Sequence, residues 1–346
     1  MTETRIRVGI VGAGANTRAR HIPGLKAIPG VEIAAVANRS RRSGETVARE
    51  FGIPRVCDHW LDLVSSEEID AVCIGTWPYL HAPVTLAALA HGKHVLCEAR
   101  MAMDAAEARE MLRASRQRPD LVAQVVPAPF TLEADGDIQW LIAEGYLGEL
   151  LAAEIAVSSG AFADAQSPLH WRQDASLSGV NAMALGIWYE TLMRWIGPAR
   201  RVTAMTRACV PWRKDASGVL RAVEVPDHVE TIAEHAAGVI AHMRFSAVTG
   251  LDARNEAWLY GREGTLRLEA GSLRLSGGRR VERELKELSR TVKSPGWRVE
   301  EEFINAICGR ETVTRTTFED GVRYMEFTEA VAHSARSGTA IALPLS

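Results

Sequence analysis

Val8-Gly9-Ile10-Val11-Gly12-Ala13-Gly14-Ala15-Asn16-Thr17 is an apolar run that ends in a glycine turn, and it decides the fold of the first part of this chain. A buried strand that turns sharply into a helix leaves backbone N–H groups unpaired at the helix start, and these groups suit a pyrophosphate. Gly12 permits the tight turn, and Gly14 lets the backbone approach phosphates without a Cβ in the way. The stretch therefore predicts a dinucleotide-binding turn.

The third position of this turn departs from the usual pattern, because Thr17 stands where Gly or Ala packs helix against strand. By itself the pattern G-x-G-x-x-T is a weak signal. Its context strengthens it, since a strand pattern precedes the turn and Ala19–Ile28 has the pattern of a helix. The cofactor contacts expected from the turn are Gly12, Gly14, Ala15, Asn16 and Thr17.

The first third of the chain alternates apolar runs with helical patterns. The expected strands are Arg7–Val11, Glu32–Ala37, Ala71–Gly75, His94–Cys97 and Val122–Val126. The helices expected between them are Ser43–Phe51, Pro83–His91 and Ala105–Arg116. Continuous apolar strands that alternate with helices indicate a parallel sheet covered on both faces. Residues 1–126 are therefore predicted to form a doubly wound Rossmann domain, which binds its ligand beyond the carboxyl ends of the strands.

From Pro127 onward, strand patterns follow one another with little helix between them. The expected strands are Leu150–Ser158, Arg201–Cys209, His228–His235, Val239–Ala247, Ala257–Gly261 and Thr265–Glu269. The expected helices lie near Ala182–Trp195, Val299–Cys308 and Phe318–Ser337. Residues 127–346 are thus predicted to form an α+β domain with a large, open, mainly antiparallel sheet.

The composition excludes several other classes of protein. Of the 346 residues, 47% are hydrophobic and 24% are charged, and the net charge of −3 does not argue for nucleic acid. No run approaches the roughly 18 apolar residues of a membrane span, and residues 1–7 carry no signal-peptide core, which predicts a cytoplasmic location away from membranes. The 5 cysteines are widely spaced without a C-x-x-C pair, so neither a metal site nor a disulfide is expected.

The residues after the second expected strand bear on the choice of dinucleotide. Proteins that prefer NAD place an acid there for the ribose 2′-hydroxyl, but residues 37–42 read Ala-Asn-Arg-Ser-Arg-Arg. Arginines and small hydroxyl groups suit a 2′-phosphate, and a basic surface loop is the alternative reading. We therefore predict NADP, with NAD as the alternative. The contacts expected from this segment are Asn38, Arg39, Ser40 and Arg42.

Two further loops are expected to line the cofactor. The first reads Gly75-Thr76-Trp77-Pro78-Tyr79-Leu80-His81, and the second reads Leu96-Cys97-Glu98-Ala99-Arg100-Met101-Ala102. Both follow predicted parallel strands, so both lie at the edge of the sheet where ligands bind. The contacts expected from these loops are Thr76, Trp77, Pro78, His81 and Glu98.

These loops resemble motifs of the glucose–fructose oxidoreductase/inositol dehydrogenase/MocA family. That family carries a T-x-P-x-x-H loop and then G-K-H-V-x-x-E-K-P, which match Thr76, Pro78, His81, Gly92-Lys93-His94-Val95 and Glu98. Later segments resemble the family in the same order: Trp171-Arg172-Gln173-Asp174, Arg194-Trp195-Ile196-Gly197 and Glu301–Ile307. The resemblance implies an NAD(P)-dependent oxidoreductase for a small polyol, sugar-like or related carbonyl substrate. It also implies a homodimer or homotetramer formed through the C-terminal sheet.

The chain departs from the family where proton transfer takes place. In the family, the lysine of E-K-P lies on the nicotinamide side of the site and assists proton transfer. Ala99 stands at that position here, and Arg100 replaces the proline. The family's D-x-G-x-H motif aligns with residues 184–188, where Ala184 and Trp188 replace its Asp and His. Thr191 replaces a further acid that the family often carries.

These replacements leave three readings of the chemistry. Hydride transfer to or from a carbinol needs a group that takes or gives the hydroxyl proton, which Ala99 and Trp188 cannot do. In the first reading, other side chains take over proton transfer. In the second, the cofactor serves different chemistry, such as reduction of a C=C or C=N bond or a non-redox reaction. In the third, the chain binds cofactor and ligand without turnover, as a sensor or scaffold.

Under the first reading, the candidates for the catalytic set are His81, His170, Tyr189 and Arg100, the last as a partner for an anionic group. Each has a structural alternative. His81 is expected to shape its loop at least as much as to transfer protons. Tyr189 follows Trp188 directly, and neighbouring residues of a helix point about 100° apart.

Overall fold

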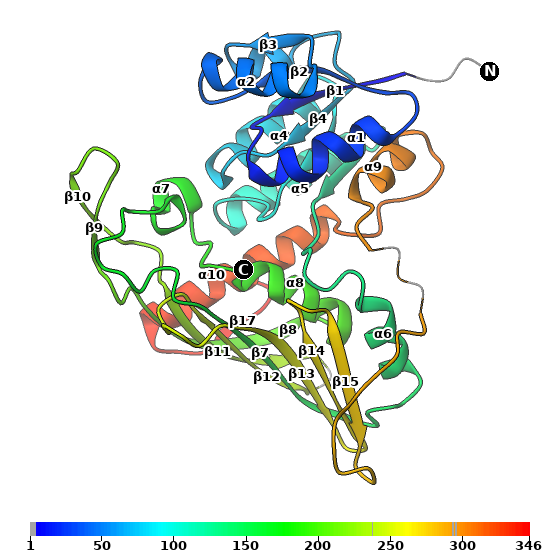
Figure 1. Ribbon diagram of the computed structural model, residues 1–346, viewed down its shortest axis with the longest axis vertical. Helices are drawn as coiled ribbons and strands as arrows, with labels where there is room; N and C mark the ends of the chain where they lie inside the picture. The colour runs from blue at the N-terminus through cyan, green and yellow to red at the C-terminus, as the bar shows by residue number, and fades with distance from the viewer. Residues whose placement is uncertain (1–4, 237, 293, 295) are drawn as a thin grey trace. The chain divides into compact units, whose positions relative to one another are not determined.

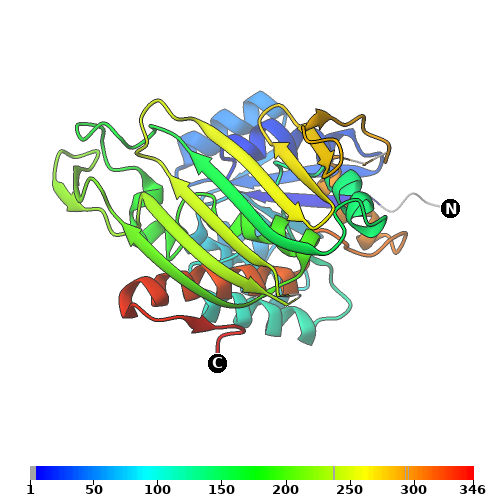
Figure 2. The same cartoon turned by 90° about the horizontal axis from the view of Figure 1, so that it is seen from below.

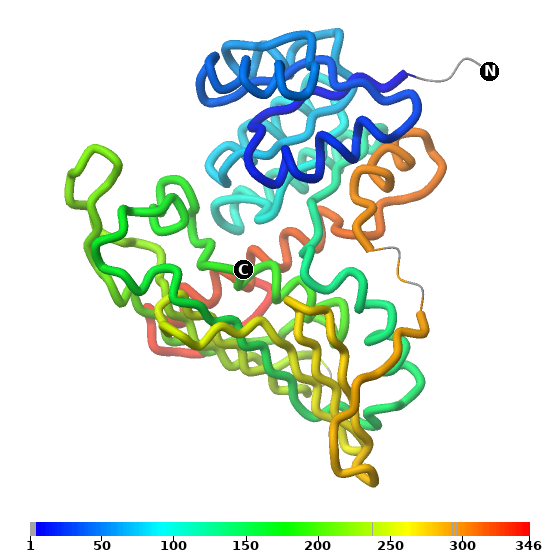
Figure 3. The backbone as a smooth tube through the Cα atoms, viewed as in Figure 1, coloured from blue at the N-terminus to red at the C-terminus, as the bar shows by residue number. Residues whose placement is uncertain are grey.

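The computed structural model describes residues 5–236, 238–292, 294 and 296–346. The chain divides into two compact units, Met1–Pro127 with Arg298–Val322, and Ala128–Trp297 with Arg323–Ser346 (Figure 1). The single boundary expected after Val126 does not account for residues 298–322, which return to the first unit (Figure 3). Residues 1–4 of the expected first domain lie outside the described residues.

The first unit is built on a parallel sheet. Among the described residues this sheet has six strands in the order β3-β2-β1-β4-β5-β6, each parallel to its neighbours. The strands are β1 (Ile6–Val11), β2 (Val31–Ala37), β3 (Arg55–Cys57), β4 (Ala71–Ile74), β5 (His94–Cys97) and β6 (Ala123–Val125). Every residue of β4 is apolar and buried, as expected of a strand covered on both faces. The strand order reverses between β1 and β4, so their carboxyl ends form the point where such sheets bind ligands.

The helices of the first unit begin and end at recognisable signals. They are η1 (Thr17–His21), α1 (Ile22–Ala27), α2 (Arg41–Phe51), α3 (Trp60–Val64), η2 (Pro78–Leu80), α4 (His81–Ala90), α5 (Ala105–Gln117) and α9 (Val299–Ile307). Ser40 caps α2 by accepting from the backbone N–H of Ser43. The single helix expected at Ala19–Ile28 is instead a π-helix, η1, followed by α1. Pro23 has no N–H to continue a regular helix across this junction.

The second unit is built on a large mixed sheet. Within the described ranges it has nine strands in the order β16-β15-β14-β13-β7-β12-β11-β8-β17. Only β7 and β12 run parallel in this part of the chain, and the other neighbours are antiparallel. The strands are β7 (Leu150–Ser158), β8 (Ala199–Arg207), β11 (His228–His235), β12 (Ile240–Ser246), β13 (Arg254–Gly261), β14 (Gly264–Glu269), β15 (Arg274–Arg279), β16 (Lys286–Glu287) and β17 (Ile341–Ala342).

One face of this sheet is buried by helices and the other is open (Figure 2). Residues of β11, β12 and β14 alternate between buried and more exposed, which is the pattern of a half-covered sheet. The remaining elements are α6 (Asp135–Ala143), η3 (Trp171–Gln173), α7 (Ala175–Ser178), α8 (Leu185–Ile196), the β9 (Trp212–Lys214) and β10 (Leu220–Ala222) hairpin, and α10 (Phe318–Ser337). Within the second unit, Ser334 of α10 accepts from the backbone N–H of Ala204 in β8, at 2.9 Å.

The architecture confirms the predicted fold class, a Rossmann-type parallel sheet plus a large, mainly antiparallel sheet. Elements that the sequence patterns did not indicate include β3, α3 and the β9–β10 hairpin. Each of these strands and this helix is only three to five residues long, which is too short to show a hydrophobic period.

Candidate functional site

The glycine turn has the geometry that its sequence predicts. Gly12 has a φ of +83°, and a Cβ there would lie 2.5 Å from Cγ2 and 2.7 Å from the backbone N of Thr76. A side chain at this position is therefore excluded for two reasons: the positive φ strains any residue other than glycine, and the Cβ would collide with Thr76. Gly14 faces the carbonyl oxygen of Gly75, 3.4 Å from where a Cβ would lie. The turn thus brings backbone close to the carboxyl end of β4, as a pyrophosphate cradle requires.

Thr17 is accommodated by a glycine on the neighbouring strand end. It is buried, and its Oγ1 donates to the carbonyl oxygen of Gly12 at 3.2 Å. A Cβ at Gly75 would overlap that hydroxyl. Thr17 therefore occupies the space that Gly75 leaves, which explains how the turn tolerates a bulky third position.

A pocket of about 520 Å³ lies at the carboxyl ends of β1, β2, β3 and β4. Six of the residues expected to contact the cofactor line it: Gly12, Gly14, Asn38, Arg39, Thr76 and Trp77. The others lie outside its lining: Ala15, Asn16, Thr17, Ser40, Arg42, Pro78, His81 and Glu98. Residues 58–60, which the sequence patterns did not indicate, complete the wall. The buried hydroxyl of Thr76 has no hydrogen-bond partner in the described part of the chain, so the pocket offers a polar group to a ligand.

Three residues that follow β2 have different roles: Asn38, Arg39 and Ser40. Asn38 Oδ1 accepts from the backbone N–H of Ala13 at 2.7 Å, which ties the end of β2 to the glycine turn. The guanidinium of Arg39 lies over the ring of Trp77, 5.6 Å from its centroid. Ser40 serves as the cap of α2. Of these residues, Arg39 supplies the positive charge in the pocket lining.

His81 holds the two predicted cofactor loops together. Its Nδ1 lies 2.8 Å from the carbonyl oxygen of Arg100, and its Nε2 lies 3.0 Å from that of Thr76. The side chain is fully buried, and burial lowers its pKa. Both ring nitrogens are occupied by backbone, so the geometry gives His81 a structural role in shaping the loops.

A buried cluster in the first unit was not indicated by the sequence patterns. His21 of η1 lies 2.9 Å through Nε2 from Glu98 Oε1 and 2.6 Å through Nδ1 from Glu300 Oε1. Asn16 also donates to Glu98 Oε1. Burial by itself lowers the pKa of His21, but the two carboxylates outweigh it and raise the pKa to about 9. His21 is therefore an imidazolium at neutral pH.

Two of the catalytic candidates, Tyr189 and His170, accept hydrogen bonds from the backbone of the second unit. The Tyr189 hydroxyl accepts from the backbone N–H of Ala199 at 2.9 Å, and its ring stacks on Phe327 at 3.7 Å. Burial raises the pKa of Tyr189 to about 12. His170 caps η3, with Nδ1 accepting from the backbone N–H of Arg172 at 3.2 Å. Neither side chain shows the geometry of a general base aimed at a ligand.

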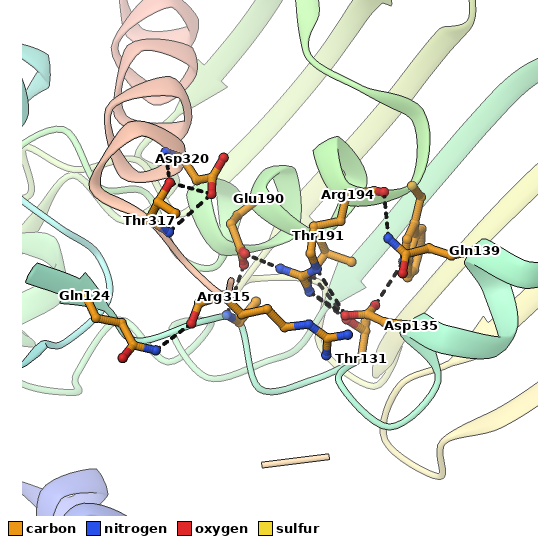
Figure 4. Close-up of polar contacts among 12 residues, drawn as sticks. Gln124, Thr131, Asp135, Gln139, Glu190, Thr191, Arg194, Arg315, Thr317 and Asp320 are labelled. Carbon is orange, nitrogen blue, oxygen red and sulfur yellow. Dashed lines mark hydrogen bonds and ion pairs between the residues drawn. The ribbon is translucent and has the colours of Figure 1, made fainter. Parts of the chain in front are cut away.

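Helix α8, where the sequence resemblance predicts an acid/base motif, holds a buried ion-pair network (Figure 4). Arg194 of α8 pairs with Glu190 one turn earlier and with Asp135 of α6, at 2.9 Å. Burial alone lowers the pKa of Arg194, but the two carboxylates outweigh it and raise the value. Glu190 also accepts from the backbone N–H of Ala128 at 3.0 Å. This carboxylate is therefore committed to structure.

Trp188 is the residue that the sequence resemblance predicts at the position of the family's histidine. It is fully buried, and its ring stacks on Phe130 with 5.8 Å between centroids and 19° between planes. Its indole Nε1 has no hydrogen-bond partner among the described residues. Thr191 accepts a 3.3 Å hydrogen bond from Arg194 and so contacts the ion-pair network.

Among the described residues, no group of three or more His, Cys, Asp or Glu side chains is placed to hold a metal ion. No described helix combines the length and the apolar composition needed to cross a membrane.

Known proteins resemble this chain in both of its parts. Residues 6–125 match an oxidoreductase family with an NAD-binding Rossmann fold, and residues 137–267 match the GFO/IDH/MocA C-terminal domain. Glucose-fructose oxidoreductase domain-containing protein 2 of Xenopus laevis is 30% identical over 215 residues, 61% of this chain and 54% of that protein. The match thus spans about half the length of that relative.

Two other relatives are similar over more of their length. Trans-1,2-dihydrobenzene-1,2-diol dehydrogenase of Mus musculus is 27% identical over 270 residues, 76% of this chain and 74% of that protein. The solved structure of levoglucosan dehydrogenase in complex with NADH and L-sorbose superposes with a TM-score of 0.87 at 21% identity, over 99% of this chain and 100% of that one. Since both parts match in order and the fold agrees along the whole length, the chain belongs to the GFO/IDH/MocA family of oxidoreductases.

Proposed function

We propose that this protein is an NADP-linked oxidoreductase that acts on a small polyol, sugar-like or related carbonyl substrate with a non-standard acid/base set. The observation that carries the proposal is the pocket at the glycine turn, with Arg39 in its wall. The names of relatives support the substrate class, since they include a diol dehydrogenase and a levoglucosan dehydrogenase. We infer the reaction of this chain by analogy with these relatives.

Charge in the pocket supports NADP over NAD. Arg39 and Asp58 both line the pocket, but Asp58 is already paired with Arg41 at 2.8 Å. Arg39 lies over Trp77, a flat surface on which a purine ring can stack, and its guanidinium suits a 2′-phosphate. Arg42 lies outside the pocket lining. Solved relatives that contain NADH make NAD the alternative to be tested.

The bound nicotinamide would supply or accept the hydride, and the residues of this chain would position it. The backbone around Gly12 and Gly14 would hold the pyrophosphate, because a Cβ at Gly12 would fill the space of the turn. His81 would keep the loops after β4 and β5 in register. Proton transfer would fall to a side chain other than Ala99 and Trp188, and His170 remains the candidate from the predicted set. Arg100 stays protonated and would instead bind an anionic group of the substrate.

A second function, cofactor binding without turnover, is favoured by one observation. Trp188 fills the histidine position with a fully buried ring, and neighbouring Tyr189 is part of the core. Under this alternative the protein is a sensor or scaffold subunit. Following nicotinamide absorbance during incubation with polyols, sugars and their carbonyl derivatives separates the two functions, since only an enzyme changes the signal.

Fluorescence titration with NADPH and NADH tests the cofactor. We expect tighter binding of NADPH, and Arg39→Ala should weaken it by about 10- to 100-fold, because a hydrogen bond to a charged group contributes about 1.5–3 kcal/mol. Arg42→Ala, which removes an arginine outside the pocket lining, is the matched control and should leave NADPH binding close to normal. Tighter binding of NADH by the unaltered protein would refute the choice of NADP.

A further inference from the structure

His59 follows β3 in the wall of the pocket at the glycine turn, and its ring is held in one orientation. Its Nδ1 accepts from the backbone N–H of Leu61 at 3.1 Å, which makes His59 the cap of α3. The ring also lies against Trp60, with 5.2 Å between centroids. Because Nδ1 accepts, the neutral ring carries its proton on Nε2. The N–H group at Nε2 is therefore a donor that the fold orients.

This donor is open to a ligand, whereas other polar groups of the same wall are already used. His59 is exposed, and its Nε2 makes no hydrogen bond to the described part of the chain. Asp58 is bound by Arg41 through both carboxylate oxygens, at 2.8 and 2.9 Å, so its negative charge is balanced. The hydroxyl of Ser43 donates to the carbonyl oxygen of the cap residue before it, at 2.9 Å. A ligand at this end of the pocket therefore meets the donors of His59 and Arg39.

The register of β2 and β3 brings His59 and Arg39 to the same edge of the sheet. The two strands are parallel, and Ala37 pairs with Cys57 at their carboxyl ends. Arg39 lies two residues beyond Ala37, and His59 lies two residues beyond Cys57. Neighbouring strands are about 4.8 Å apart, and both residues line the pocket. One guanidinium and one imidazole N–H are thus available to the same ligand group.

We propose that His59 is a specificity-determining residue for NADP, and that its Nε2 donates a hydrogen bond to the 2′-phosphate beside the guanidinium of Arg39. This inference rests on the proposed binding of NADP. A phosphate group has three strong acceptor oxygens, and a guanidinium that binds it bidentately takes two of them. The third oxygen needs another donor, which His59 supplies. NAD gains less from this donor, because a hydrogen bond to its neutral 2′-hydroxyl is weaker than one to a charged phosphate.

Calorimetric titration with two ligands that differ only in the 2′-phosphate tests the proposal. They are adenosine 2′,5′-bisphosphate and adenosine 5′-monophosphate. His59→Asn keeps an acceptor near the place of Nδ1, so it can still cap α3, but it has no donor at the place of Nε2. We expect this variant to bind the bisphosphate about tenfold more weakly, because a hydrogen bond to a charged group is lost. Binding of the monophosphate should be unchanged.

A second variant separates phosphate binding from helix capping. His59→Gln places an amide N–H near the position of Nε2 but loses the acceptor near Nδ1. We expect it to keep most of the preference for the bisphosphate and to lower the urea midpoint, because α3 loses its cap. His91→Asn, at an exposed histidine on the same unit, is the matched control and should leave binding of both ligands unchanged.

The outcomes distinguish this inference from the proposed function. Equal losses for both ligands in His59→Asn, or undiminished binding of the bisphosphate, would overturn the role of His59. If the preference for the bisphosphate is then lost only in Arg39→Ala, the choice of NADP stands without His59. Loss of the preference in His59→Gln but not in His59→Asn would assign the effect to the cap and also overturn the inference. If the unaltered protein binds both ligands equally, the choice of NADP fails together with it.

Discussion

Thr17 is larger than the usual third residue of the turn, and Gly75 lacks the side chain that would collide with it. The hydroxyl of Thr17 occupies the space that a side chain at position 75 would need. The threonine is held there by its hydrogen bond to the carbonyl oxygen of Gly12. The glycine at the end of β4 is thus as much a part of the dinucleotide turn as the glycines of the turn itself.

Gly75→Ala is therefore expected to destabilise the protein and to weaken dinucleotide binding. The added methyl group overlaps Thr17 and the backbone of Gly12, and such overpacking typically costs about 1–3 kcal/mol. The urea midpoint reports the stability and NADPH fluorescence reports the binding. Gly271→Ala, where a Cβ meets nothing within 4 Å and, as at Gly75, φ is not in the left-handed region, is the control. A Gly75→Ala protein as stable as the Gly271→Ala protein would contradict this account.

His21 should make stability depend on pH in the alkaline range. The folded protein raises its pKa from 6.5 to about 9, so its contribution is complete below pH 6.5 and is lost as pH rises through about 9. Such a shift corresponds to roughly 3 kcal/mol. Urea unfolding measured from pH 6 to 10 should show the loss in the unaltered protein and a flatter profile in His21→Gln. Identical profiles would rule out a charged His21.

At the scale of elements, α6 and α8 are joined by an ion pair. Arg194 of α8 reaches Asp135 of α6, and Trp195 donates from Nε1 to the same carboxylate at 2.9 Å. The arginine side chain is 15% exposed and both of its carboxylate partners are nearly or fully buried. The ion pair from Arg194 and the hydrogen bond from Trp195 therefore connect α8 to α6.

Arg194→Met is expected to cost about 3–5 kcal/mol of unfolding free energy, because it leaves two buried carboxylates without their cation. Arg201→Met removes an arginine whose pair with Glu234 is exposed, and should cost less than about 1 kcal/mol. Chemical denaturation of both variants provides the comparison. If the two variants lose similar amounts, the network in α6 and α8 contributes no more than a surface ion pair.

At the scale of the whole molecule, the open face of the large sheet is the surface through which we propose that copies associate. Apolar side chains that are well exposed stand on four neighbouring strands of this sheet: Leu151, Ile240, Ile232 and Met205. Polar and charged side chains such as Glu230, Glu234 and His242 lie between them, and such a mixture of apolar and polar side chains is typical of an interface between subunits. A homodimer or homotetramer through this face remains our proposal.

Ile232→Glu should reduce the size of the particle in solution. Ile232 is 58% exposed at the middle of β11, and a carboxylate there would have to be desolvated in the interface. Light scattering after size exclusion gives the mass. Val219→Glu changes a similarly exposed side chain, 52%, in the turn of the β9–β10 hairpin, and should leave the mass unchanged. An unaltered protein that runs as a monomer would refute the proposed assembly.

Local signals were sufficient for much of the fold. The glycine turn and the apolar strands each act within a few residues, so their patterns indicated a parallel sheet and the end that binds a ligand. Site residues were harder to assign, because a residue type does not say whether a side chain points to ligand or core. The sequence made Tyr189 a catalytic candidate, but in the structure its hydroxyl accepts a hydrogen bond from the backbone N–H of Ala199.

The sequence by itself determined the class of fold and the place of the cofactor turn, because strand period, glycine spacing and family motifs are short-range properties of the chain. Only the tertiary structure decided what surrounds that turn. His21 and Glu300 are 279 positions apart, and no local pattern links them. Gly75 makes room for Thr17 only once β1 and β4 lie side by side. Such pairings depend on which distant segments share a core, and this is settled when the whole chain packs.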